Sequence, residues 1–144
     1  MAQLIAASGM TAVTHANREA EPDALALMTR LGAKYGKVGL WATSGHGPVA
    51  LVAASSATCA VLNNPMTKDF CPATPLFIIR AGKDETPGLN AGLDAFIARA
   101  IGENRPVTVV NYPEAPHSYE LSVEGPETRR VLQQGLDFLR AHLG

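Results

Sequence analysis

The sequence predicts an α/β protein, a three-layer α/β/α sandwich around a mostly parallel sheet of about five strands. Short apolar runs rich in β-branched residues alternate along the chain with stretches of helical periodicity. Most of these runs are almost continuously apolar, as expected of strands buried on both faces of a parallel sheet. At 144 residues the chain has room for a single domain, residues 1–144.

The expected strands are residues 10–14, 38–42, 58–62, 76–79 and 107–111. A first long helix is expected from about Pro22, because the first turn of a helix tolerates proline, and Gly36 is its expected end. One face of this helix is apolar, formed by Ala24, Leu27, Met28 and Leu31. This face is expected to pack on the core.

Three further helices are expected: one directly after Ser44, one over residues 87–101 and one from about Pro126. Leucines recur at helical spacing in the last of these, at Leu132, Leu136, Leu139 and Leu143. No internal repeat, low-complexity tract or linker interrupts the chain. The pattern therefore fits one domain.

Charge and composition exclude several classes of protein. A net charge of −1 gives no electrostatic reason to expect nucleic acid or a membrane surface as partner. No apolar run approaches the roughly 20 residues that span a bilayer, and the first ten residues lack the basic region of a signal peptide. Cys59 and Cys71 are expected to be reduced thiols without metal spacing. We therefore expect a cytoplasmic protein with no cofactor.

A serine stands where a strand meets a helix. Residues 37–44, KVGLWATS, form a buried strand that runs straight into a helix beginning GHGPVALVAA. This junction is typical of the nucleophile elbow, where a tight turn presents the serine hydroxyl at the carboxyl edge of the sheet. Ala42 fits the usual G-x-S-x-G pattern two positions before Ser44, whereas His46 does not fit two positions after it. A serine that merely caps the helix is the alternative.

An acid and a histidine follow later strands. Asp84 lies in the turn after residues 76–79, where a helix cap or a turn residue is the alternative interpretation. Glu85 is a weaker candidate for the same role. Among the four histidines, only His117 lies in a loop at the carboxyl end of a late strand. A single histidine in a loop is ordinarily just solvated.

The combination of the three residues favours chemistry. Reactive groups in open α/β sheets gather at the carboxyl ends of the strands, and the chain order Ser, Asp, His is that of the hydrolase elbow architecture. Ser44 is then the nucleophile, His117 the base and Asp84 the residue that orients the imidazole. The backbone N–H groups of Gly45 and His46 are the expected oxyanion donors.

The segments that contain Ser44, Asp84 and His117 resemble the α/β-hydrolase superfamily, specifically its dienelactone-hydrolase-like members. The matching segments cover most of the chain in the expected order: LIAASGMTAVTHANREAEPDAL, VGLWATSGHGPVAL, PLFIIRAGKDETPGLNAGLDAFI and TVVNYPEAPHSYEL. The resemblance implies the same roles for Ser44, Asp84 and His117, in a truncated α/β-hydrolase fold. Dienelactone hydrolases usually carry a cysteine nucleophile, so Ser44 points towards simple ester hydrolysis.

Members of this family usually have strands and an oxyanion loop before the segment where this chain begins. Of the two usual oxyanion donors, only the Gly45 N–H is visible, and losing one donor costs roughly 10²–10³ in kcat. Substitutes are the N–H of His46 or Gly47, the side chain of His15 or Asn17, or a second subunit. The short segment 63–75 also leaves an open site, which favours small or extended acyl esters.

In the family, one missing strand lies between the equivalents of residues 10–14 and 38–42. These two segments are therefore expected either to pair directly or to leave a gap that a partner chain fills. An exposed apolar edge of a sheet promotes association, so we expect a homo-oligomer, most simply a twofold homodimer.

The leading hypothesis is a short-chain carboxylesterase, with a thioesterase or a lactonase as close variants. The rival is a catalytically impaired remnant of the fold that serves as a binding or assembly module. A nucleotide-binding domain is excluded because no G-x-G-x-x-G follows the first expected strand. Bulky polar residues, His15 and Asn17, stand there instead.

Overall fold

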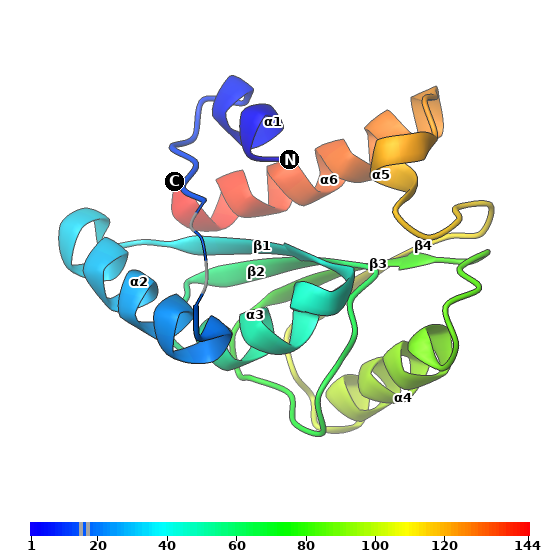
Figure 1. The fold of residues 1–144 in the computed structure, drawn as a ribbon, viewed down its shortest axis with the longest axis horizontal. Helices are drawn as coiled ribbons and strands as arrows, with labels where there is room; N and C mark the ends of the chain where they lie inside the picture. Colours follow the sequence, from blue (N-terminus) through cyan, green and yellow to red (C-terminus); the bar gives the residue numbers. More distant parts are fainter. Residues whose placement is uncertain (15, 17) are drawn as a thin grey trace.

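The computed structural model describes residues 1–14, 16 and 18–144. Within this part of the chain, four strands form one parallel sheet whose spatial order follows the chain order (Figure 1). The strands are β1 (Gly39–Thr43), β2 (Cys59–Asn63), β3 (Leu76–Ala81) and β4 (Val107–Tyr112). The predicted α/β class is confirmed, and four of the expected strands are present within two residues of the expected bounds.

Helices cover both faces of the sheet (Figure 1). On one face lie α2 (Ala20–Tyr35), α3 (Gly47–Ala54) and α4 (Leu89–Gly102); on the other lie α6 (Pro126–Leu143), with α1 (Ala2–Ala7) and α5 (Tyr119–Ser122) beside it. Helix α2 ends where expected, at Gly36, whose φ of 77° is readily adopted only by glycine. Residues 64–75 join β2 to β3 as a loop without a helix.

The fifth expected strand is wrong. Residues 10–14 form no strand, and β1 pairs with β2 alone among the described residues. The apolar pattern of this segment reflects packing instead, since Met10 contacts the core on the α6 side of the sheet. An apolar run predicts burial, but hydrogen bonding to a neighbouring strand depends on distant residues that the run does not encode. β1 is consequently an edge strand.

The core has one layer on each side of the sheet. On the α3 and α4 side, Leu62 of β2 and Ile78 of β3 pack with Leu51, Leu93 and Phe96. On the α6 side, the alternate residues of the same strands pack with the residues Tyr119, Val131, Leu132 and Leu139. Both faces of β2 and β3 are therefore buried, which explains their continuous apolar sequence.

The parallel arrangement brings the carboxyl ends of all four strands to one edge of the sheet. The loops that follow β1, β3 and β4 therefore emerge at this same edge. The loops after β3 and β4 are neighbours, and β2 lies between β1 and β3. Within the described residues, every helix is too short or too polar to cross a lipid bilayer.

Candidate active site

Ser44 follows β1 directly and has left-handed backbone geometry. It opens a short 3₁₀ helix, η1 (Ser44–His46), with a φ of 51°, which is uncommon for a residue with a side chain. The Ser44 carbonyl accepts hydrogen bonds from the N–H of Gly47 and from the N–H of Met66, the latter at 2.9 Å. These contacts hold the sharp turn from the strand into the helix, as expected for a nucleophile elbow.

The small residue that this elbow requires is Gly47, one position later than the usual pattern. A Cβ atom at Gly47 would lie 2.1 Å from the Met66 carbonyl oxygen and 2.6 Å from the Pro65 Cβ. His46, in contrast, is exposed. The mismatch at His46 is therefore compatible with the turn, because the close approach to the loop after β2 occurs at Gly47.

The Asp84 carboxylate lies at the end of the turn that follows β3. Its Oδ1 accepts a 2.7 Å hydrogen bond from the Thr86 N–H, and its Oδ2 lies 2.5 Å from the His117 Nδ1. Burial of the carboxyl raises its pKa, but hydrogen bonds from Thr86 and His117 outweigh this effect and hold the pKa below its ordinary value. The side chain has no exposed surface, whereas the neighbouring Glu85 is exposed.

His117 joins the two other residues. Its Nε2 lies 3.1 Å from the Ser44 Oγ, while its Nδ1 faces Asp84. With the ring proton on Nδ1, His117 donates to the Asp84 carboxylate, and its Nε2 is free to accept the serine proton. The ring keeps 37% of its side-chain surface exposed, so solvent reaches the site. The structure thus brings Ser44, His117 and Asp84 together, and Glu85 stays outside the group.

The loops that carry Asp84 and His117 are tied to each other. The N–H of Gly82 donates to the Tyr112 carbonyl and that of Lys83 to the Ala115 carbonyl, both at 2.8 Å. A Cβ at Gly82 would lie 2.3 Å from the Pro113 carbonyl oxygen. A glycine at position 82 therefore permits the close approach of the loops that carry Asp84 and His117.

Asn64, which was not predicted from the sequence, supports the Asp84 carboxylate. The Asn64 side chain is buried, donates through Nδ2 to the Asp84 Oδ2 and accepts a 2.9 Å hydrogen bond from the Ala81 N–H. It therefore fixes the carboxylate relative to the end of β3. The signal was present in the run Asn63-Asn64-Pro65, two amides at the carboxyl end of a buried strand.

Thr86 is a second missed contact. Besides the hydrogen bond from its N–H to Asp84, its Oγ1 lies 3.3 Å from the His117 Nδ1. The spacing from Asp84 to Thr86 is that of an Asx turn, in which a carboxylate accepts from the N–H two residues later. Asp84 is thus both a turn residue and the partner of His117, so the two alternatives weighed from the sequence are compatible.

The expected oxyanion donors lie at the start of η1. Gly45 and His46 are its second and third residues, and the first N–H groups of a helical segment have no acceptor within it. Gly47, one of the substitutes considered, donates its N–H to the Ser44 carbonyl, which removes it as a donor to substrate. The side chains of His15 and Asn17, also considered, belong to residues outside the described part of the chain.

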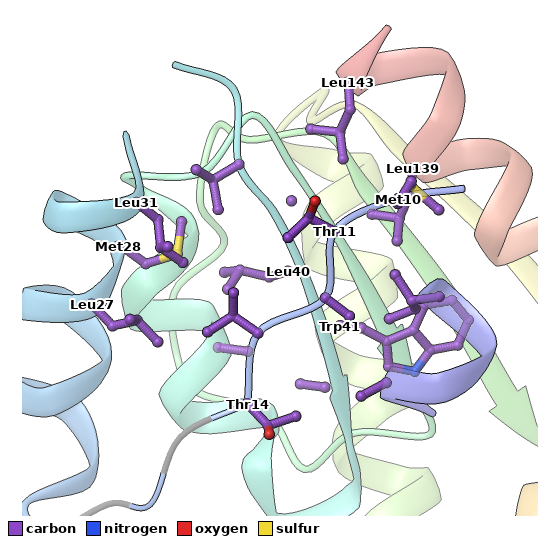
Figure 2. A pocket seen from close by; sticks show the side chains of 18 of the residues that line it. Met10, Thr11, Thr14, Leu27, Met28, Leu31, Leu40, Trp41, Leu139 and Leu143 are labelled. Carbon is purple, nitrogen blue, oxygen red and sulfur yellow. The ribbon is translucent and has the colours of Figure 1, made fainter. Parts of the chain in front are cut away.

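A large apolar groove adjoins this site (Figure 2). It has a volume of about 890 Å³ and runs between β1, α2 and residues 9–14, with α6 at its far side. Thr43 and His46, on either side of Ser44 and Gly45, belong to its lining. The groove occupies the position where a fifth strand was expected beside β1.

Ser44, His117 and Asp84 are the side chains on which any chemistry at this site depends. Among the described residues, no group of three His, Cys, Asp or Glu side chains is arranged to hold a metal ion. Comparison with known proteins adds no assignment, because no protein-family model and no curated protein matches the chain. The three side chains and their surroundings are consequently the basis for any functional proposal.

Proposed function

We propose that this protein is a serine hydrolase that cleaves carboxylic esters through an acyl-enzyme on Ser44. One observation carries the proposal: the His117 ring lies 3.1 Å from the Ser44 Oγ through Nε2 and 2.5 Å from the Asp84 carboxylate through Nδ1. A serine, an imidazole and a buried carboxylate in this sequence of contacts form the arrangement that activates a hydroxyl at neutral pH.

The reaction proceeds in two halves. The Ser44 Oγ attacks the ester carbonyl carbon while the His117 Nε2 takes the serine proton, and the resulting tetrahedral intermediate collapses with protonation of the leaving alcohol by His117. Water then attacks the acyl-enzyme with His117 again as the base, and the carboxylic acid is released. Asp84 holds the imidazole in the required tautomer and stabilises the imidazolium.

The oxyanion of the intermediate needs hydrogen-bond donors. The N–H groups of Gly45 and His46 are the candidates, because both lie directly after the nucleophile at the start of a helical segment. Backbone donors of this kind are fixed before substrate arrives, so they require no rearrangement during the reaction.

Substrate preference and location complete the proposal. Because the His117 ring is partly exposed, the site admits small esters such as short-chain acyl esters, and the same chemistry extends to thioesters and lactones. The mechanism uses no cofactor. We place the protein in the cytoplasm, where the free thiols of Cys59 and Cys71 are stable in the reduced state.

Labelling with a fluorophosphonate probe tests the proposal. The probe forms a covalent bond with an activated serine, so we expect labelling of the wild type and none of Ser44→Ala. Ser55→Ala, which removes an exposed serine at the opposite end of α3 from Ser44, is the matched control and should label like the wild type. Absence of labelling in folded wild type would favour the catalytically impaired binding module instead.

Turnover of p-nitrophenyl acetate assigns the roles. His117→Ala should lower kcat about as far as Ser44→Ala, because the members of such a triad act as a unit. Asp84→Asn should fold but lose on the order of 10⁴-fold in kcat, since the amide favours the wrong tautomer of the imidazole. Retained activity in Asp84→Asn would move the acid role to another residue, with Glu85 as the first candidate.

A further inference from the structure

The groove beside Ser44 is lined mainly by hydrocarbon. Leu27 and Leu31 come from α2, and Leu40 and Trp41 from β1 (Figure 2). Further apolar side chains come from α6 and from the segment before α2, namely Leu139, Leu143 and Met10 (Figure 2). A volume of about 890 Å³ is within the range of small-molecule sites. A surface of this kind binds an apolar ligand.

The groove also has a direction. Its lining follows β1 from Lys37, just before the strand, to Thr43 at the carboxyl end. Six residue steps of a strand, at about 3.3 Å each, span roughly 20 Å. One end therefore lies next to Ser44, whereas the other end lies where Lys37 provides a positive charge.

The end near Ser44 connects the groove to the proposed chemistry. Thr43 precedes the nucleophile and His46 follows the first oxyanion candidate, Gly45, and both line the groove. An acyl group bonded to the Ser44 Oγ, with its carbonyl oxygen at the N–H groups of η1, has the mouth of the groove within reach.

We infer that the groove binds the acyl chain of the substrate, which makes the preferred substrates esters of unbranched, medium-length fatty acids. This inference rests on the proposed ester hydrolysis and refines it. Of the two kinds of ester that an open site admits, small and extended, the groove favours the extended kind. The chain lies along β1 with its methyl end pointing away from Ser44.

A series of p-nitrophenyl esters from acetate to dodecanoate tests the inference in the wild type. Each buried methylene contributes roughly three- to fourfold in binding, so the four methylenes that separate butyrate from octanoate should raise kcat/KM by roughly 10²-fold. A flat or falling series, with acetate hydrolysed well, would overturn the inference and leave the ester hydrolysis intact.

Variants that fill the groove sharpen the test. Val49→Phe adds an aromatic ring to the lining near His46, so the advantage of octanoate over butyrate in kcat/KM should disappear. Val52→Phe is the matched control, because Val52 has the same partial burial on α3 and is not part of the groove lining. Thr11 also lines the groove and is exposed, so Thr11→Phe should not impair folding. This variant should likewise reduce the advantage of octanoate over butyrate.

A binding readout separates this inference from the proposed function. Trp41 is the single tryptophan of the chain and lines the groove, with its ring packed against α6 near Gly135. In the inactive Ser44→Ala variant, dodecanoate should change the Trp41 fluorescence in a saturable manner. Adding Val49→Phe to this variant should weaken the affinity for dodecanoate at least tenfold. An unchanged spectrum would reject the groove as the acyl site, even in a protein that hydrolyses esters.

Discussion

Ser44, the proposed nucleophile, has an unfavourable backbone conformation. A left-handed φ costs an L-amino acid roughly 1–2 kcal/mol, and glycine avoids this cost. The serine is therefore retained at a position where the fold would favour glycine. In the proposed function, Ser44 contributes to chemistry at the expense of stability.

Comparison of two inactive variants measures this cost. Ser44→Gly should exceed Ser44→Ala in free energy of unfolding by about 0.5–1 kcal/mol, because both lose the hydroxyl and only alanine keeps the strained conformation. Urea unfolding provides the measurement. At Ser55, whose φ is −58°, the order should reverse and the alanine variant should be the more stable one. Equal stabilities of the two Ser44 variants would show that the turn is unstrained.

The individual residues of the site differ in how visible they are in the sequence. Ser44, Asp84 and His117 stand out because each follows a strand, and strand ends share one edge of a parallel sheet. Asn64 follows a strand as well, yet an amide has no distinctive chemistry and its role appears only in its contact with Asp84. Hydrogen-bond partners of this kind depend on loop geometry, which sequence patterns do not specify.

At the scale of the elements, the site depends on how two loops meet. The loop after β3 carries Asp84, the loop after β4 carries His117, and Gly82 lets their backbones touch at Pro113. The side chains of Lys83 and Glu114 pair across the same contact. The geometry of the acid and the base is therefore a property of this junction.

Gly82→Ala should disturb that junction. Its Cβ would overlap the Pro113 carbonyl, so we expect a loss of about 1–3 kcal/mol in stability and at least about tenfold in kcat towards p-nitrophenyl acetate. Gly92→Ala, in α4, is the matched control, since a Cβ there would meet only the Thr67 Oγ1, at an ordinary contact distance of 3.7 Å. Unchanged kcat in Gly82→Ala would show that the approach of the loops does not set the position of Asp84.

Four of the five expected strands were predicted correctly, and residues 10–14 were not. The strands now labelled β1 to β4 were predicted because long apolar runs between helical patterns leave few alternatives in an α/β chain. Residues 10–14 have a similar pattern, but they lie across the groove from β1 without pairing to it. Which extended segments share hydrogen bonds is decided by the packing of α2, α6 and the sheet together.

At the scale of the whole molecule, both outer strands leave an edge unpaired among the described residues. The edge of β1 borders the groove, whereas β4 exposes Thr108, Val109 and Asn111. A twofold axis beside β4 would join two sheets into one through antiparallel pairing and leave both grooves open. We therefore predict a homodimer formed through β4.

Light scattering at micromolar concentration tests the dimer. Val109→Lys should shift the mass to that of the monomer while turnover of p-nitrophenyl acetate is unchanged, since Val109 lies within β4 and not in the loops that carry Ser44, Asp84 and His117. Ile101→Lys, at a 62% exposed position on α4, is the control and should remain dimeric. A monomeric wild type would remove the prediction, and a dimer insensitive to Val109→Lys would point to the β1 edge.

The order of the sheet also has a consequence for synthesis on the ribosome. Each strand pairs with the next one to be translated, so the sheet can grow as the chain emerges. Helix α6 follows all four strands in the chain, and until it is synthesised the apolar face of the sheet that it covers is exposed to solvent. The nascent polypeptide therefore exposes an apolar face until α6 has been synthesised, so we expect chaperone binding to be strongest before that point.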